Sequence, residues 1–245
     1  MTEPKILLFD LETCGPNSLR SDLASILMFG YMWIGDKRAR ILTADQFPNW
    51  FSKHGVNDKP LLKAALKIMQ DADLIVAHYG ERFDRKFLQG RCAIHGLTPP
   101  PPTKLVDTWR IARTAFNFSS NRLGDLCDNL RLKHKKLIKE KPDHWPMWWV
   151  RAMAGDRSAI REMREYCLAD VEALAELYMY IRKFSNTHPR LYEDREKCRL
   201  CGGTVQMRGT CFVGEHKYRR YECTRCGKWD RERKALKDVV DTDTE

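Results

Sequence analysis

The sequence has no long apolar run and no recognisable leader. Nowhere does it approach the roughly 18–20 consecutive apolar residues that are needed to span a bilayer. Residues 1–6 lack the basic segment followed by an apolar stretch that marks a secretory signal, and no internal repeat is visible. These absences favour a cytoplasmic protein, and the 43% apolar content predicts an ordinary buried core.

Acidic residues are scarce in one part of the chain only. Residues 182–237 carry 16 Lys and Arg against 7 Asp and Glu, whereas the rest carries 27 against 26. The formal net charge of +10 therefore lies almost wholly in this C-terminal segment. A basic module on a neutral body indicates a polyanionic partner, most commonly nucleic acid. A solvated charged surface is the alternative.

Cysteine is plentiful, but only four of the nine residues are grouped. They form two C-x-x-C pairs, each followed directly by glycine, at Cys198, Cys201, Cys223 and Cys226. In a reducing compartment this clustering indicates a metal rather than disulfides. Four thiolates make a closed tetrahedral site for one structural Zn²⁺, with a single iron as the chemical alternative. The sequence predicts a zinc ribbon, with a hairpin in the 21-residue gap between the pairs.

Hydrophobic patterning predicts an α/β fold with a mixed sheet flanked by helices. Strands are expected over residues 5–12, 25–34, 39–44, 74–77 and 104–109, with the second and third joined as an antiparallel hairpin. Helices are expected over 61–72, 80–94 and 158–183, and a Pro- and Trp-rich interruption at 141–149. We expect a main domain over residues 1–185, a basic zinc-ribbon module over 186–237, and an acidic tail over 238–245.

Two acids end the first strand. Asp10 and Glu12 are two residues apart, so their side chains leave the same face of the strand. Because they follow a run suited to burial, two ionised carboxylates there would be costly unless a cation holds them. An acidic strand end that faces water is the alternative, and the pair is not specific when taken alone.

A third acid interrupts an apolar helix face. Along residues 158–183, apolar side chains recur at spacings of three and four, and Asp170 takes the one polar place in this stripe. Tyr166 precedes it by four residues and so lies on the same side, one turn away. Asp84 stands in the first turns of the helix over residues 80–94. There it could also be an ordinary N-terminal acid favoured by the helix dipole.

These segments together resemble the three motifs of the DEDDy 3′–5′ exonucleases, in the DnaQ-like branch of the ribonuclease H-like superfamily. The resemblance covers residues 5–182. The motifs are, in order, Phe9-Asp10-Leu11-Glu12-Thr13, His78-Tyr79-Gly80-x-x-Phe83-Asp84 and Tyr166-x-x-x-Asp170. They fall on a strand, near a helix start and late in a helix, which is the order and placement of the family.

The resemblance implies a two-metal phosphodiester hydrolase, with two ions about 3.5–4 Å apart. Asp10 would bridge both ions, while Glu12 and Asp170 would hold the one that activates water. Asp84 would support the second ion through water, and Tyr166 would orient or deprotonate the attacking water. Oxygen ligands and a phosphate substrate favour Mg²⁺ or Mn²⁺.

Nucleic-acid contacts are expected from both parts of the chain. Family members often have Asn where this sequence has Tyr79, a residue that could stack on a base or simply pack. Basic residues interleave with aromatics in the ribbon, as suits a single strand, at Arg208, Lys217, Arg219, Arg220, Arg225 and Lys228. The ribbon's Tyr and Trp residues could instead form its own core. The tryptophans at 145, 148 and 149 could line the entry for a 3′ end or pack in the core.

The leading interpretation is a 3′–5′ exonuclease acting on single-stranded or 3′-ended DNA, with RNA as a further substrate class. Its location would be the cytoplasm, near the nucleoid, or a host cytoplasm if a phage encodes it. Two alternatives stay open. The acidic site could cut internally or at a structure, or the protein could be a non-catalytic nucleic-acid-binding zinc-ribbon protein.

Overall fold

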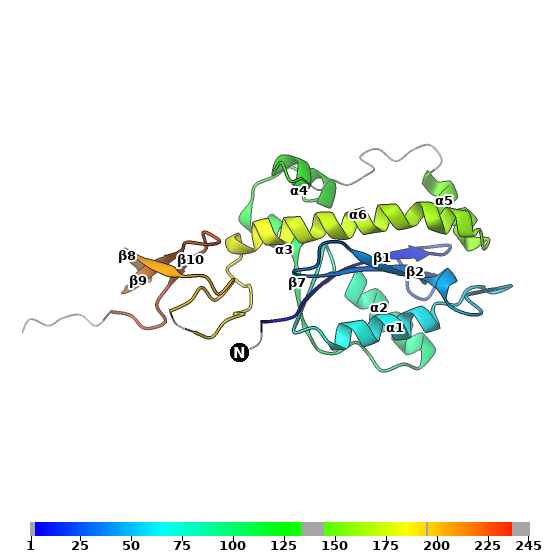
Figure 1. Cartoon of the computed structure of the whole chain (residues 1–245), viewed down its shortest axis with the longest axis horizontal. Coiled ribbons are helices and arrows are strands. Elements are labelled where there is room, and N and C mark those ends of the chain that lie inside the picture. The colour runs from blue at the N-terminus through cyan, green and yellow to red at the C-terminus, as the bar shows by residue number, and fades with distance from the viewer. Residues whose placement is uncertain (1–2, 134–144, 195, 237–245) are drawn as a thin grey trace, which may run out of the picture. The chain divides into compact units, whose positions relative to one another are not determined.

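The computed structural model describes residues 3–133, 145–194 and 196–236 (Figure 1). The chain forms two compact units, Met1–Ile181 and Arg182–Glu245, which we call the N-terminal and C-terminal units. Within the described residues, no helix has the length and apolarity needed to cross a membrane.

The N-terminal unit is built on a five-stranded mixed sheet with the order β3-β2-β1-β6-β7. Two antiparallel pairs join β1 to β2 and β2 to β3, and two parallel pairs join β1 to β6 and β6 to β7. This confirms the mixed sheet and the hairpin that the sequence predicts. The strands are β1 (Ile6–Cys14), β2 (Ser25–Trp33), β3 (Arg40–Thr43), β6 (Leu74–Ala77) and β7 (Lys104–Asp107).

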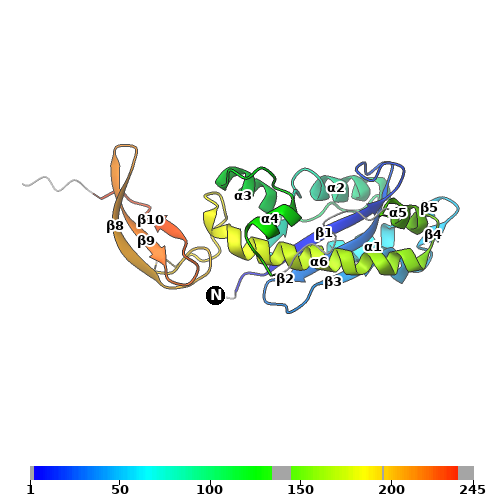
Figure 2. The same ribbon diagram turned by 90° about the horizontal axis from the view of Figure 1, so that it is seen from above.

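Helices cover both faces of this sheet. In Figure 1, the long helix α6 lies on one side of β1 and β2, and α1 and α2 lie on the other. Figure 2 shows α6 running along the sheet from above. The helices are α1 (Lys59–Gln70), α2 (Asp84–His95), α3 (Thr108–Ala115), α4 (Leu123–Asn129), α5 (Trp145–Met153) and α6 (Arg157–Ile181). Short elements are η1 (Ala44–Gln46), β4 (Phe51–Ser52), β5 (Gly55–Val56) and η2 (Arg182–Phe184).

Several element boundaries differ from the sequence-based expectation, and three of them affect the site or its surroundings. The strand expected to reach residue 109 ends at Asp107, because this side chain caps α3 by accepting the amides of Trp109 and Arg110. The helix expected from residue 80 begins at Asp84, after a turn. The expected interruption is wrong from residue 145 onward, where α5 begins, and residues 141–144 lie outside the described residues. Trp148 and Trp149 pack against the main core.

Helix α6 approaches the sheet most closely at a glycine. Gly30 of β2 lies opposite Asp10 of β1. A Cβ atom at Gly30 would lie 2.7 Å from Sγ of Cys167 and 2.9 Å from Cγ2 of Val171, both on α6. Only a residue without a side chain allows this packing. Because Asp170 directly precedes Val171, the same contact brings the acid of α6 towards β1.

A buried ion pair ties α2 to the residues before α1. Asp58 has no solvent exposure and accepts two hydrogen bonds from Arg91, Nε to Oδ2 at 2.9 Å and Nη2 to Oδ1 at 2.7 Å. Oδ2 also accepts the amide of Ile26 at 2.8 Å, and Nε2 of His95 lies 2.6 Å from Oδ1. These donors compensate the cost of burying the carboxylate.

The C-terminal unit contains a three-stranded antiparallel sheet in the order β10-β9-β8. Its strands are β8 (Val205–Val213), β9 (His216–Cys223) and β10 (Trp229–Arg231). The hairpin of β8 and β9 fills the gap between the two cysteine pairs, as the sequence predicts. Among the described residues of this unit, the buried apolar cluster consists of Cys198, Leu200 and Cys223, with Cys201, Val205 and Cys226 packed against it.

Candidate acidic metal centre and cysteine site

Three carboxylates from two elements converge in the N-terminal unit. One oxygen from each of Asp10, Glu12 and Asp170 lies within 4.8 Å of the other two. The first two come from β1, and the third comes from α6, which packs against β1 and β2. Asp170 is 5% exposed, whereas Asp10 and Glu12 are partly exposed. The structure therefore brings together three of the four acids that the sequence indicates.

This arrangement suits a hard cation. Three carboxylates at such short separation repel one another, and partial burial strengthens the repulsion because the surroundings are less polar than water. A divalent ion removes that cost, and carboxylate oxygens are the ligands that Mg²⁺ and Mn²⁺ prefer. The donor set of this acidic cluster, defined as Asp10, Glu12 and Asp170, fits such an ion.

Asp84 lies outside this set of three but adjoins it. Burial raises the pKa of its carboxyl to about 7, and hydrogen bonds from its own amide and that of Leu11 partly offset this, while the Asp107 charge raises it slightly. Leu11 stands between Asp10 and Glu12 in β1. Asp84 is 2% exposed, and its Oδ1 accepts no hydrogen bond within the described part of the chain. A buried oxygen without a donor fits a cation or a cation-bound water as its partner.

Tyr166 places a hydroxyl beside the acids. Its residue is 6% exposed and lies one turn before Asp170 on α6. Burial raises the pKa of the phenol well above its ordinary value, and the charges of Asp170 and Glu12 raise it further. The hydroxyl also donates a hydrogen bond to the Asp170 carboxylate. The phenol is therefore protonated and acts as a donor towards the acidic cluster.

Asp107 organises the loop that leads to α2. It is not among the site residues predicted from the sequence. Its Oδ1 accepts the amides of Tyr79 and Trp109, each at 2.9 Å, and its Oδ2 accepts the amide of Glu81 at 3.1 Å. One carboxylate thus fixes the end of β6, the approach to α2 and the start of α3. Asp107 could have been found from the sequence as an Asp directly before a helix, which is the usual N-cap arrangement.

Tyr79 has a strained backbone and an exposed ring. Its φ is +64°, a left-handed conformation that costs a bulky residue roughly 1–2 kcal/mol, and it is 39% exposed. Its ring meets Trp109 edge-on with centroids 5.2 Å apart. The guanidinium of Arg82 lies 5.9 Å from the Tyr79 ring and 5.7 Å from the Trp109 ring. We call these three residues the Tyr79 platform.

The Tyr79 platform and the first two acids lie toward the same end of two neighbouring parallel strands. In the pair of β1 and β6, Leu8 lies opposite Val76. Tyr79 comes two residues after the end of β6, and Asp10 comes two residues after Leu8 in β1. The sequence indicated Tyr79 but missed Arg82 and Trp109, because nothing in their spacing shows that they share a surface with it.

The cysteine site has the geometry of a four-sulfur cage. All four sulfur atoms lie within 4.8 Å of one another, with 3.5 Å between Cys201 and Cys223 and 3.7 Å between Cys198 and Cys226. Four sulfurs at the usual Zn–S distance in a tetrahedron lie about 3.8 Å apart. The donor set therefore fits a zinc ribbon.

The two halves of the cage repeat one local structure. The amides of Leu200 and Cys201 point at the sulfur of Cys198, and those of Arg225 and Cys226 point at Cys223. The glycine after each pair, at 202 and 227, has φ of +69° and returns its amide to the carbonyl of the first cysteine, at 2.8 and 3.0 Å. The left-handed turn explains why glycine follows both pairs.

The basic residues expected to contact nucleic acid all lie in the C-terminal unit. Four are exposed on the β8–β9 hairpin, and Arg225 is exposed in the second cysteine turn. Arg208 pairs with Glu222 at 3.1 Å, and Arg220 lies over the Trp229 ring at 5.3 Å. Lys228 differs from these because it is half-buried and its Nζ donates to the carbonyl of Ser185 at 2.7 Å.

Comparison with protein families decides the affiliation of the N-terminal unit. A family model described as the RNase H superfamily matches residues 7–182. The chain belongs to the RNase H superfamily. Membership supports a nuclease activity and a nucleic-acid substrate for this RNase H-like chain, and the acidic cluster lies within the matched residues.

A search of curated proteins found no match to the sequence. Among solved structures, the family B DNA polymerase from the hyperthermophilic archaeon Pyrobaculum calidifontis is similar, with a TM-score of 0.52 and 15% identity. The match covers 74% of this chain and 26% of the polymerase, so the chain spans about a quarter of that protein's length. At this identity, the likeness concerns the fold alone.

Proposed function

We propose that the chain is a metal-dependent 3′–5′ exonuclease of the DnaQ-like DEDDy type. One observation carries the proposal. Three carboxylates from β1 and α6 converge beside the phenol of Tyr166, with the buried Asp84 next to the strand that carries two of them, within a fold of the RNase H superfamily. The alternative is that Asp10 and Glu12 form an acidic strand end that only faces water. In that case nothing would require Asp170 to interrupt the apolar face of α6.

Each side chain has a role suited to its position. The acidic cluster would hold one divalent ion, and Asp84, with its buried Oδ1, would support a second. When bound, two such ions supply an activated water and stabilise the departing 3′ oxygen. Tyr166 donates from the cluster's edge and is placed to orient the attacking water.

The remaining parts would hold the strand. The Tyr79 platform offers aromatic faces and a cation beside the acids, which suits unpaired bases at a 3′ end. The C-terminal zinc ribbon contributes the positive surface, with 16 Lys and Arg against 7 acids over residues 182–237. The substrate would be single-stranded or 3′-ended DNA, with RNA as a second candidate, and the protein would act in the cytoplasm.

A labelled-substrate assay tests this function. The full chain, loaded with zinc, is incubated with Mg²⁺ or Mn²⁺ and a 5′-labelled single strand. We expect a ladder that shortens from the 3′ end, with nucleoside 5′-monophosphates as products, for DNA, RNA or both. Asp170→Asn should lose at least roughly 100-fold in rate while still binding the strand.

A circular single strand and a strand with a blocked 3′ end serve as matched controls. Neither should be degraded by an exonuclease. Cleavage of the circle would instead assign the acidic cluster to endonucleolytic cutting. Binding of all substrates with no cleavage under any metal condition would leave a binding protein, and would refute the proposed activity.

A further inference from the structure

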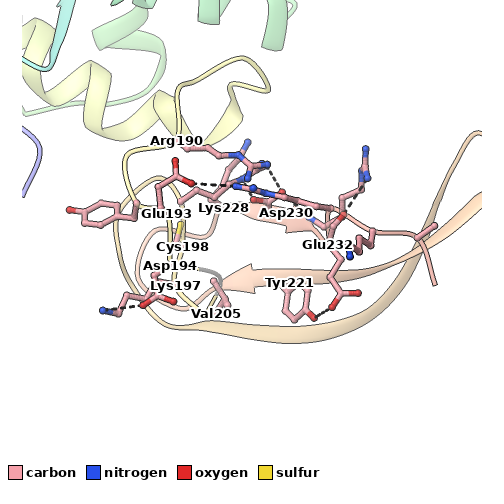
Figure 3. A pocket seen from close by; sticks show the side chains of 16 residues that line it. Arg190, Glu193, Asp194, Lys197, Cys198, Val205, Tyr221, Lys228, Asp230 and Glu232 are labelled. Carbon is pink, nitrogen blue, oxygen red and sulfur yellow. Dashed lines mark hydrogen bonds and ion pairs between the residues drawn. The ribbon is translucent and has the colours of Figure 1, made fainter. Parts of the chain in front are cut away.

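The C-terminal unit contains a cavity of about 350 Å³ whose wall is unusually rich in cations (Figure 3). This volume lies in the lower range of small-molecule pockets. Figure 3 shows Arg190, Lys228 and Asp230 on the same side of it. We call it the basic cavity and define it by Arg190, Arg199, Lys228 and Arg231. Two of these four, Arg199 and Lys228, flank the metal-binding cysteines in sequence.

Carboxylates in the wall compensate only part of this charge. Asp230 pairs with Arg199, Asp194 with Lys197 at 3.4 Å, and Glu193 with Arg233 at 3.5 Å. Glu232 accepts the hydroxyl of Tyr221 at 3.0 Å and lies 3.6 Å from Arg219, which stands outside the wall. Arg190 and Arg231 have no carboxylate partner among the described residues.

The negative charge of the cysteine site helps to balance the other two cations, Arg199 and Lys228. Four thiolates with one divalent ion carry a net charge of −2. Arg199 directly follows Cys198 in the sequence and pairs with Asp230, and Lys228 follows Cys226 by two residues. The thiolates and Asp230 therefore balance Arg199 and Lys228. The charge of Arg190, Arg231 and Lys234, which line the cavity without a carboxylate partner among the described residues, remains.

Three of the four cations that define the cavity are held in place before any ligand binds. The guanidinium of Arg231 lies 4.2 Å from the centre of the Tyr218 ring, and its Nη1 donates to the carbonyl of Glu232 at 3.3 Å. Arg199 is fixed by Asp230, and Lys228 by the carbonyl of Ser185. Cations gathered at fixed positions repel one another, and an anion with several acceptor oxygens relieves this repulsion.

We propose that the basic cavity binds a phosphate group through Arg190 and Arg231. Guanidinium groups match the paired oxygens of phosphate, and the cavity can hold a group of nucleotide size. Tyr192 and Tyr221 in the wall offer aromatic surface for an attached base. The phosphate site itself is inferred from the cavity alone. The further inference, that the phosphate belongs to a nucleic-acid strand, rests on the proposed function.

Calorimetric titration of the full, zinc-loaded chain tests the proposal. Asp10→Asn protein in buffer without Mg²⁺ or Mn²⁺ is used, so that the acidic cluster neither cleaves nor takes up phosphate. The probes are inorganic phosphate, 2′-deoxyadenosine 5′-monophosphate and a short single-stranded oligonucleotide. The cavity variant is R190Q with R231Q. The control variant, K63Q with K67Q, removes the same charge from exposed positions of α1 that lie outside the cavity.

We expect the cavity variant to bind all three probes roughly tenfold more weakly or worse, because two charge-assisted contacts are lost. The control variant should bind phosphate and the mononucleotide as the parent does. A larger loss for the oligonucleotide than for the mononucleotide identifies a strand as the source, and equal losses identify a free nucleotide.

Three results would overturn the proposal: no phosphate binding by the parent, unchanged binding by the cavity variant, or equal weakening in the control variant. Zinc content and circular dichroism of each variant exclude unfolding as the cause. The titration is independent of turnover, so failure of the nuclease assay leaves its outcome unaffected.

Discussion

The carboxyl of Asp84 adjoins the backbone of Leu11, which lowers its pKa against the larger, opposite effect of burial. Leu11 separates Asp10 from Glu12, so the start of α2 lies next to the strand that carries the first two acids. Asp84 is therefore a neighbour of the three acids whose oxygens come within 4.8 Å of one another.

Gly30 is predicted to be required for the position of Asp170. In Gly30→Ala, the new Cβ would lie 2.7 Å from Sγ of Cys167, so α6 must shift away from β2. We expect a stability loss of about 1–3 kcal/mol and a fall in nuclease rate of roughly tenfold or more, because small displacements of catalytic groups are costly. Urea unfolding and the exonuclease assay measure the two effects.

The second-site variant G30A with C167A provides the control, because it removes the closest atom and should recover part of both losses. Full activity in Gly30→Ala would show that the close approach of α6 does not position the acid.

Tyr79→Asn is predicted to separate backbone strain from substrate contact. Asn tolerates the left-handed conformation, so relief of roughly 1 kcal/mol of strain offsets a similar loss of ring contact with Trp109. Stability should therefore change little. The KM for a single-stranded end should rise roughly 5- to 100-fold, because base–aromatic stacking is lost.

A strand whose 3′-terminal nucleotides are abasic tests whether stacking is the cause. On this substrate, the two proteins should have the same KM. If the difference persists without bases, the Tyr79 platform does not act by stacking.

Arg91→Met is predicted to destabilise the N-terminal unit by about 3–5 kcal/mol, because it leaves the fully buried Asp58 without its bidentate partner. The matched change Arg40→Met breaks an exposed pair with Asp36 and should cost at most about 1 kcal/mol. Chemical denaturation followed by tryptophan fluorescence compares the two variants. Equal effects would mean that the Asp58 pair does not anchor α2.

Removal of the metal is predicted to unfold the C-terminal unit while the N-terminal unit stays folded. Strands β8 and β9 are largely exposed, and the buried cluster contains three of the described residues, so a metal bound by the four cysteines would supply most of the stability. Structural zinc contributes roughly 10–16 kcal/mol in small modules. Limited proteolysis with and without a chelator should show cleavage confined to residues beyond 181. Cys226→Ser should behave as the chelated protein does.

The acids and cysteines could be found from the sequence because each breaks a local pattern. Asp10 and Glu12 end an apolar strand, Asp170 interrupts an apolar stripe, and each cysteine pair has metal-ligand spacing followed by glycine. Such departures are visible within a few residues. Burying these polar or charged side chains costs free energy unless a metal ion or a hydrogen-bonding group pairs with them. The mixed sheet and the ribbon hairpin follow likewise from local periodicity and turn signals.

What the sequence could not show depends on contacts between distant segments. Gly30 resembles any strand glycine until α6 is seen against it. Asp107 resembles a strand residue until its carboxylate is seen to accept amides from the turn after β6 and from the first turn of α3. Arg190 and Arg231 are 41 positions apart by their numbers in the sequence and share a cavity only after the ribbon folds. The boundary error at residue 109 arose because capping by the Asp107 side chain, rather than periodicity, sets the end of the strand.

The central claim, that the acidic cluster holds divalent cations, is tested most directly by anomalous diffraction from crystals of the protein grown with Mn²⁺. The account predicts an anomalous peak between the carboxylates of Asp10, Glu12 and Asp170, and its loss in Asp170→Asn. Mn²⁺ found only at other acids, with this cluster empty at saturating concentration, would contradict the account.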